Sequence, residues 1–419
     1  MQTIVLTEYE KRLFPPETLT LNEAELLWQR YRQQILVEPP SFKTQGQWQL
    51  TAQGWCGFVP LNRDLAFAIE PKVPLSSLFE MLSLAYGLDE VEFGEELIGA
   101  NVLDGLVDGL AWLLARQVEG LWRQGLAQGY VERIEPLPYI SGQIEVAALA
   151  ASAKPQQVVC RHEILTPDVR SNQILLWTLH LILQMGRVST KVQQAVQRSY
   201  RLLAPQITLR TVRADELPPL IANHQTRNRF RTNQNSIRYE QALALCHFFL
   251  NHCGPSHQVG DQSMVSFLIP TAHLFERFVA IWLQQNLPSQ YTLRIQERQN
   301  LGSHEHLHFA IDLAVYERSS GQIRWVMDTK YKVPNRTPST DDIAQVIAYA
   351  EATGSLDAVL IYPLPLAQKF DEQIGQIRVR ALPFDLGRNL NHSGEEYLKV
   401  LGYATIGPDT PHRQAPMPP

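Results

Sequence analysis

The clearest structural pattern in the sequence is His306-Leu307-His308-Phe309-Ala310-Ile311-Asp312-Leu313-Ala314-Val315, followed after a turn by Ile323-Arg324-Trp325-Val326-Met327-Asp328-Thr329-Lys330-Tyr331. Branched and aromatic residues dominate both runs, which is typical of β-strands, and Ser319-Ser320-Gly321-Gln322 is typical of a turn. The pattern predicts a β-hairpin that brings one aspartate from each strand together.

The two aspartates lie in apolar strands, where a charged side chain is costly unless it is paired or bound to a metal. Alternate residues of a strand share a face, so Asp328 and Lys330 point the same way, and strand pairing places Asp312 beside them. Hydrolysis of a phosphodiester needs a hard cation such as Mg²⁺, which proteins hold with one or two carboxylates. The residues therefore predict a metal-dependent nuclease in which Lys330 positions or deprotonates the attacking water. The alternative is that each aspartate is a surface charge at a strand end.

Elements on either side of the hairpin supply further polar residues. Residues 271–283 have the apolar periodicity of a helix and carry Glu276, which is either a third carboxylate of the site or a solvated surface residue. Residues 341–350 predict a second helix, on which Gln345 and Tyr349 are four apart and share one face. This pair either touches the phosphate backbone or, through the tyrosine ring, caps the core.

The order of these elements is helix, strand, strand, helix and strand, the last at residues 357–363. In this order, Glu276, Asp312, Asp328-Thr329-Lys330 and Gln345-Val346-Ile347-Ala348-Tyr349 resemble the PD-(D/E)xK nuclease superfamily. Asp328-Thr329-Lys330-Tyr331-Lys332 followed by that helix resembles the McrC family, the nuclease subunit of McrBC modification-dependent restriction systems. The resemblance extends through the amino-terminal half, at residues 68–73, 129–133 and 139–144. One departure is Ile311, which stands where the superfamily has a nominal proline.

The resemblance implies a set of site residues and their roles. The expected catalytic residues are Asp312, Asp328, Lys330 and Glu276. The expected ligands of a Mg²⁺ ion are Asp312, Asp328, Thr329 and Glu276. The residues expected to contact DNA are Gln345, Tyr349 and Lys332.

The McrC resemblance also implies a partner. In that family the amino-terminal part docks onto a ring of McrB-type AAA+ subunits and stimulates their GTP hydrolysis, while a domain of the McrB-type chain reads modified cytosine. We expect docking through the strands of residues 42–73, with Asn62, Arg63 and Asp64 at an exposed turn. The alternative is that these three are ordinary hairpin-turn residues. The chain itself has no Gly-x-x-x-x-Gly-Lys-Ser/Thr loop and is not expected to hydrolyse a nucleotide.

Three histidines, His304, His306 and His308, alternate along the first strand of the hairpin. Alternation places the imidazoles on one strand face, which is compatible with a zinc site. Structural zinc usually draws four ligands at recognisable spacing, and no cysteine lies nearby. The pattern therefore favours solvated histidines over a zinc site.

Composition indicates an ordinary globular protein of two or three domains, because the chain has 419 residues of which 45% are hydrophobic. Its four cysteines show no paired spacing, and no run approaches the roughly 20 apolar residues that span a bilayer, so we expect a cytoplasmic protein. The net charge of −5 is unusual for a DNA enzyme and favours a partner that supplies part of the affinity.

We expect an α+β multidomain fold in four regions. Residues 1–74 form a small β meander for docking, 75–260 a mainly helical region, 261–400 an α/β restriction-endonuclease-like domain of the PD-(D/E)xK type, and 401–419 a disordered tail. The expected function is that of a Mg²⁺-dependent DNA endonuclease subunit in a complex that acts on modified cytosine. Two alternatives stay open, a stand-alone PD-(D/E)xK nuclease in repair or processing and a non-catalytic activator of the ring's GTPase.

Overall fold

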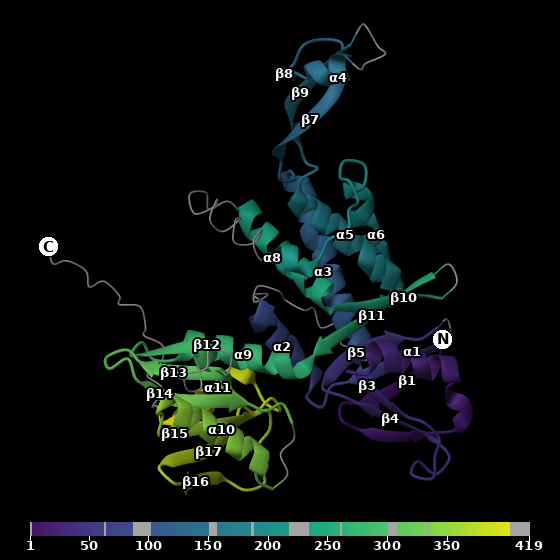
Figure 1. Cartoon of the computed structure of the whole chain (residues 1–419). Coiled ribbons are helices and arrows are strands. Elements are labelled where there is room, and N and C mark those ends of the chain that lie inside the picture. Colours follow the sequence, from purple (N-terminus) through teal and green to yellow (C-terminus); the bar gives the residue numbers. More distant parts are fainter. Residues whose placement is uncertain are drawn as a thin grey trace, which may run out of the picture. The chain divides into compact units, whose positions relative to one another are not determined.

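A computed structural model gives the architecture of the chain (Figure 1). It describes residues 2–62, 64–86, 102–150, 157–185, 188–217, 234–259, 262–300, 308–332 and 336–402. The chain forms two compact units, which we treat separately. Unit 1 comprises residues 1–70 and 86–269, and unit 2 comprises residues 71–85 and 270–419.

Unit 2 is built on a sheet with the strand order β12-β13-β14-β15-β17-β16. The strands are β12 (Tyr291–Asn300), β13 (His308–Glu317), β14 (Ile323–Thr329), β15 (Asp357–Tyr362), β16 (Phe370–Ile374) and β17 (Ile377–Pro383). β14, β15 and β17 run parallel, whereas β12, β13 and β14 are joined as antiparallel neighbours. The predicted hairpin is β13–β14, with Leu313 opposite Met327.

Helix α10 (Thr340–Thr353) covers one face of this sheet. It begins at Ser339, whose hydroxyl accepts a hydrogen bond from the Asp342 N–H, and it ends at Gly354 in the left-handed region with φ +71°. The apolar residues of its inner face and of the strands below form a continuous core: Ile311, Val326, Val346, Ala350, Ala358, Leu360 and Val379. The packing of this helix therefore fixes the distance between β14 and the residues in the first two turns of α10.

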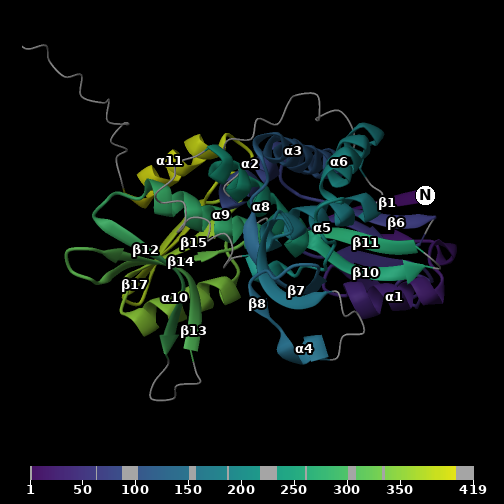
Figure 2. The same cartoon turned by 90° about the horizontal axis from the view of Figure 1, so that it is seen from above.

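Helices α9 (Thr271–Asn286) and α11 (Leu390–Leu401) pack with each other through aromatic side chains, and Figure 2 shows α11 on the side of the sheet opposite α10. The ring of Phe384 makes edge contacts with Phe278 and Trp282 of α9. Gly394 of α11 lies against the Trp282 ring, where an added Cβ would clash with the indole. Helix α2 (Leu75–Tyr86) also belongs to this unit, and Ser77 Oγ donates to the Leu386 carbonyl at 2.6 Å.

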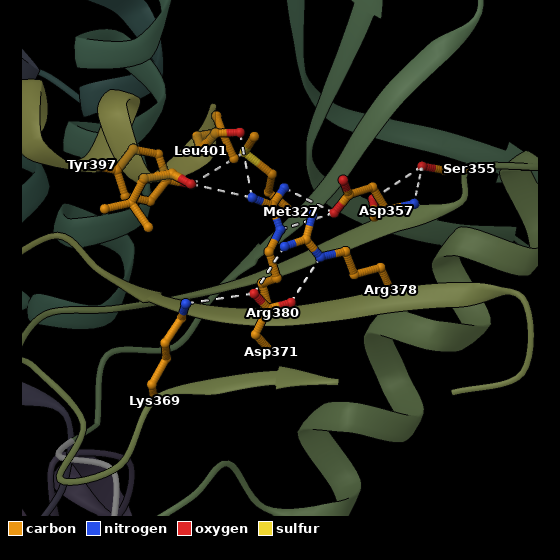
Figure 3. A network of polar contacts seen from close by, with 10 residues as sticks. Met327, Ser355, Asp357, Lys369, Asp371, Arg378, Arg380, Tyr397 and Leu401 are labelled. Atoms are coloured by element: carbon orange, nitrogen blue, oxygen red, sulfur yellow. Dashed lines mark hydrogen bonds and ion pairs between the residues drawn. The ribbon is translucent and has the colours of Figure 1, made fainter. Parts of the chain in front are cut away.

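A buried ion pair ties the parallel strands to the end of α11 (Figure 3). Arg380 of β17 donates through Nε and Nη2 to Asp357 Oδ1 of β15, at 3.1 and 2.9 Å. Its remaining Nη1 reaches the carbonyls of Val400 and Leu401, both at 3.4 Å. The guanidinium therefore satisfies carbonyls at the end of a helix while neutralising a buried carboxylate, which is how a buried charge becomes tolerable.

Unit 1 contains three sheets and a group of helices. A five-stranded sheet has the order β1-β6-β5-β11-β10, a second sheet the order β2-β4-β3, and a third the order β7-β9-β8. The strands are β1 (Gln2–Thr7), β2 (Lys11–Phe14), β3 (Ile35–Glu38), β4 (Trp48–Ala52), β5 (Trp55–Pro60), β6 (Leu65–Glu70), β7 (Gly129–Leu137), β8 (Gln143–Ile144), β9 (Val158–Thr166), β10 (Cys253–Val259) and β11 (Gln262–Pro270). The helices are α1 (Leu21–Tyr31), α3 (Val102–Gln124), α4 (Val146–Ala150), α5 (Arg170–Met185), α6 (Thr190–Leu203) and α8 (Gln234–His252), with short 3-10 turns at Pro16–Thr18 and Ala214–Glu216.

The architecture is a mixture of helices and several sheets, as expected, but its division differs from the expected one. The strands of residues 42–73 do not form one meander, because β4 pairs with β2 and β3 whereas β5 and β6 lie in the five-stranded sheet. The region 75–260 includes the β7-β9-β8 sheet. The expected boundary at 260 falls between β10 and β11, which are paired strands of unit 1. The expected tail lies outside the described residues from 403 onward.

No helix in the described part of the chain is long and apolar enough to cross a membrane.

Candidate active site

The two predicted aspartates meet at the end of the β13–β14 ladder. Asp312 and Asp328 each lie one residue beyond the last opposed pair, Leu313 and Met327. Asp312 Oδ2 accepts hydrogen bonds from both the N–H and the hydroxyl of Thr329, each at 2.9 Å. The side chain thus binds the backbone of the opposite strand where the ladder stops. Asp328 is almost fully buried, with 1% of its surface exposed.

Lys330 faces Asp328 as strand alternation predicts. Its Nζ lies 2.7 Å from Asp328 Oδ2, and it donates to Gln345 Oε1 of α10 at 2.9 Å. Among the described residues, the Lys330 ammonium is the only cation paired with the buried Asp328 Oδ2. The strongest other charge acting on this carboxylate is negative, that of Asp312.

Electrostatic repulsion links the carboxylates. Burial raises the pKa of Asp328 to about 7, and the nearby Asp312 carboxylate raises it further while Lys330 opposes the rise. Burial and then Asp312 also raise the pKa of Glu276. Burial alone would lower the pKa of Lys330, but the carboxylates of Asp328, Asp342 and Asp312 outweigh burial and raise it. Asp312 is the charge common to all three groups, so the cluster is one electrostatic unit with excess negative charge.

Glu276 is held at the edge of this cluster by residues of α9 and β12. Its carboxylate accepts a hydrogen bond from Gln296 Nε2 and lies 3.7 Å from His273 Nδ1. Gln296 has a left-handed backbone, φ 53°, at a point where the β12–β13 pairing skips a residue. The prediction did not include Gln296, because the polar run of residues 291–300 gave no strand signal.

Gln345 and Tyr349 form a hydrogen-bonded chain that ends at the lysine. Gln345 Nε2 donates to the Tyr349 hydroxyl at 2.6 Å, while Gln345 Oε1 accepts from Lys330. Tyr349 is buried, and its ring packs edge-on against Phe309. Both residues therefore act within the protein on Lys330, and of the two only Gln345 is exposed.

Lys332 contacts a carboxylate that the sequence did not single out. Its Nζ lies 2.5 Å from Asp342 Oδ2 and 3.5 Å from Ser339 Oγ. Asp342 was visible in the sequence only as one of two acidic residues at the start of a helix, where an N-terminal dipole role is the ordinary interpretation. No periodicity distinguishes it from its exposed neighbour Asp341.

The donor set suits a hard divalent cation. In the described part of the chain, no three His, Cys, Asp and Glu side chains are arranged as a metal cage. Mg²⁺ needs no such cage, because one or two carboxylates and several waters usually hold it. Asp312 and Asp328 offer two carboxylates that repel each other and have the Lys330 ammonium to offset them. The residues present therefore fit Mg²⁺ rather than a structural zinc.

The remaining expected residues lie elsewhere or outside the described residues. Asn62 Oδ1 accepts from the backbone N–H groups of Asp64 and Leu65, and its amide donates to Glu23 of α1. Asn62 is thus a turn residue with internal partners. Arg63, His304 and His306 are not among the described residues, and His308 is exposed at the start of β13.

Comparison with known proteins shows which family the chain resembles. Residues 50–363 match the family model described as the McrBC 5-methylcytosine restriction system component. A relative from Escherichia coli (strain K12), the type IV methyl-directed restriction enzyme EcoKMcrBC, is 24% identical over 235 residues. That match spans 54% of this chain and 63% of the relative.

A solved structure shares the fold. It is a chain of the half-complex of Thermococcus gammatolerans McrB AAA+ hexamers with bound McrC, with a TM-score of 0.59 and 16% identity. The match covers 96% of this chain and 100% of that one. Since the family model matches more than half of the sequence, the chain belongs to the McrBC 5-methylcytosine restriction system component family.

Proposed function

We propose that the chain is the Mg²⁺-dependent endodeoxyribonuclease subunit of a McrBC-like complex that restricts DNA containing modified cytosine. Unit 2 is the nuclease, of the PD-(D/E)xK type, and its partner is a McrB-like AAA+ GTPase ring. The observation that carries the nuclease assignment is the cluster of Asp312, Asp328 and Lys330, in which a buried carboxylate is repelled by a second carboxylate and paired with a single ammonium. Such a group is costly to fold unless it serves a ligand.

Asp312 and Asp328 would hold the metal, with Glu276 at the edge of the site. Bound Mg²⁺ neutralises charge on the scissile phosphate and lowers the pKa of a bound water. Thr329 fixes the Asp312 carboxylate through two hydrogen bonds, which sets the spacing between the two aspartates. Thr329 itself was expected as a ligand, and its hydroxyl donates to Asp312 Oδ2 at 2.9 Å, so we assign it to positioning of that carboxylate.

Lys330 would orient the attacking water and stabilise negative charge that develops in the transition state. Gln345 accepts one of its hydrogens and Asp328 faces it, so the ammonium is held from two sides. Tyr349 in turn receives the Gln345 amide, and its buried ring leaves the pair little freedom. We therefore assign Gln345 and Tyr349 to positioning of Lys330, with exposed Gln345 alone in reach of DNA. Charge that is positioned before the reaction in this way makes the largest single contribution to transition-state stabilisation in many enzymes.

Three variants test the site. Asp328→Ala and Asp312→Ala should abolish Mg²⁺-dependent cleavage of methylated plasmid in the presence of the ring partner, because each removes one of two metal-holding carboxylates. Lys330→Ala should keep DNA affinity and metal affinity but lower kcat by about 10²–10³. Asp341→Ala, at an exposed carboxylate of the same unit, is the control. Wild-type cleavage by Asp328→Ala over a Mg²⁺ titration would exclude the assignment.

The partner assignment rests on the family and on an exposed apolar surface of unit 1. On one face of the β7-β9-β8 sheet, Tyr130 and Leu165 are directly opposed and Ile134 lies on the same side of β7. The exposed fractions of Tyr130, Leu165 and Ile134 are 71%, 54% and 52%. Glu132 and Glu163 lie opposite each other between these apolar residues, so the face combines exposed apolar and charged side chains, a combination that suits a protein interface. We propose that this face, rather than the turn at residues 62–64, contacts the ring.

A further inference from the structure

A second lysine–carboxylate pair stands beside the first. Asp342 lies in the first turn of α10 and its side chain is 8% exposed, yet it carries a charge. Its Oδ2 receives Lys332 Nζ at 2.5 Å and the Tyr362 hydroxyl at 3.1 Å. Burial would raise the pKa of Asp342, but Lys332, Ser339 and Tyr362 together hold it below its usual value. The carboxylate is thus ionised and fully partnered in a nearly dry position.

Two lysines contact side chains of α10 in the same way. Gln345 receives Lys330, and Asp342, three residues earlier on the same helix, receives Lys332. The two lysines lie two residues apart in the turn that follows β14, where the Lys332 N–H donates to the Lys330 carbonyl at 2.8 Å, and the two acceptors are adjacent on one helical face. We propose that α10 holds both lysines toward the DNA backbone, with Asp342 as the positioning residue for Lys332 as a phosphate contact.

The chemistry of Lys332 agrees with this role, which rests on the proposed nuclease function. Its side chain is 43% exposed, whereas that of its partner is almost wholly buried. An ammonium has three hydrogens, and Asp342 with Ser339 takes two of them, which leaves one for a phosphate oxygen. Holding a free lysine in one conformation costs entropy, so a lysine held before DNA binds loses less on binding.

The position of Asp342 links this pair to the cleavage site. Its charge contributes to the raised pKa values of both Asp328 and Lys330. Lys332 offsets that charge locally. Without Lys332, Asp342 would be an uncompensated anion facing the DNA backbone, so the pair is expected to act as a unit.

The test is a double-mutant cycle with Asp342→Asn, Lys332→Met and the double variant, each in the full chain with its ring partner. The asparagine keeps the size of the aspartate side chain and can still accept the Tyr362 hydroxyl. Asp342→Asn should raise the KM for methylated plasmid about tenfold with kcat nearly unchanged, and it should not raise the KM further in the Lys332→Met background. Lys332→Met should also reduce the salt dependence of DNA binding by about one phosphate contact. Asp341→Asn, which removes the same charge from the exposed neighbour, should leave KM unchanged.

The ion pair between Lys332 and Asp342 can also be tested without an assay of DNA cleavage. Competitive acylation of lysines followed by mass spectrometry should show Lys332 protected in the wild type and in Asp341→Asn, and exposed to reagent in Asp342→Asn. Equal labelling of Lys332 in all three overturns the inference, as do additive KM effects or a lower KM for Asp342→Asn. If Asp342→Asn fails to fold, Lys332→Gln probes the contact from its half-exposed side, and an unchanged KM there overturns it. If the wild-type chain never cleaves DNA, the proposed function and the DNA role of Lys332 are both overturned. This holds even if acylation shows that Lys332 is paired with Asp342.

Discussion

Asp328 carries an electrostatic penalty that the fold does not relieve. Its carboxylate is buried, with Asp312 near it and Lys330 as the counter-charge that opposes the penalty. Asp312, by contrast, accepts two hydrogen bonds from Thr329. This contrast between the two aspartates supports the proposal that Asp328 serves a metal ion.

This penalty predicts a pH-dependent stability of the metal-free chain. The pKa of Asp328 is raised to about 7 in the folded state, so the folded chain binds a proton that the unfolded chain releases near pH 4. Stability from this group is complete below the unfolded pKa and is lost as pH rises through about 7. Asp328→Asn removes the titration and should stabilise the chain at pH 8 by on the order of 4 kcal/mol.

The measurement is a thermal melt in EDTA at pH 4.5 and pH 8. The Tm advantage of Asp328→Asn should be present at pH 8 and nearly absent at pH 4.5, and Asp341→Asn should show none at either pH. An advantage that is equal at both pH values would mean that Asp328 is not protonated by burial, and the electrostatic account of the site would fail.

Sequence alone predicted the contacts that follow from strand alternation. Asp312, Asp328 and Lys330 lie together as predicted, because a period of two and one hairpin fix their geometry. Asp342 and Gln296 were missed because their roles depend on contacts across the unit. Asp342 is significant only when α10 is packed above Lys332, and Gln296 only when β12 lies beside α9.

At the scale of elements, the apolar strands were predictable and the polar ones were not. β13, β14 and β15 carry continuous apolar runs, which mark buried strands. β12 reads Tyr-Thr-Leu-Arg-Ile-Gln-Glu-Arg-Gln-Asn and is held by pairing with β13 rather than by its own pattern. The β7-β9-β8 sheet was missed for a related reason, because the apolar residues Tyr130, Val131 and Ile134 of β7 are exposed on both faces of the strand and show no alternation.

The exposed face of that sheet carries the prediction for docking. Tyr130→Ser with Leu165→Ser should weaken binding to the McrB-like ring by about 10²-fold, because paired aromatic and aliphatic side chains at an interface centre are typical hot spots. The same variant should lose stimulation of GTP hydrolysis by the ring. Calorimetric titration and a GTPase assay measure the two effects.

The matched control tests the site expected from sequence. Arg63→Ala with Asp64→Ala alters the turn between β5 and β6 without removing the Asn62 hydrogen bonds. It should bind the ring as the wild type does. If this control loses binding while the Tyr130 and Leu165 variant keeps it, docking belongs to the turn.

At the scale of the whole molecule, the two units are interleaved along the chain. Residues 71–85 leave unit 1 to supply α2 to unit 2, and the chain returns to unit 1 before entering unit 2 again at residue 270. Sequence patterns could not show this, because α2 has the same apolar periodicity whichever unit it packs against. Its buried side chains, Leu78, Met81, Leu82 and Ala85, say only that some partner covers them.

The interleaving changes how the two functions can be separated. A fragment of residues 1–260 removes β11, which lies between β5 and β10 in the unit 1 sheet, and leaves the edge of β5 unpaired. Such a fragment should misfold or aggregate. A fragment of residues 1–270 keeps the sheet whole. It should fold by circular dichroism and bind the ring, provided that the apolar face of α2 is made polar by Leu78→Lys and Leu82→Glu.

If the proposed division of labour holds, this 1–270 fragment raises the GTPase rate of the ring but cuts no DNA, because Asp312, Asp328 and Lys330 are absent. The full chain with Asp328→Ala is the matched control, since it should stimulate GTP hydrolysis equally and also fail to cut. Should the fragment fold yet neither co-elute with the ring nor change its GTPase rate while the control does both, docking must involve unit 2. If neither protein affects the ring and the wild type still cleaves DNA, the stand-alone nuclease becomes the better assignment, because cleavage would then need no nucleotide-driven partner.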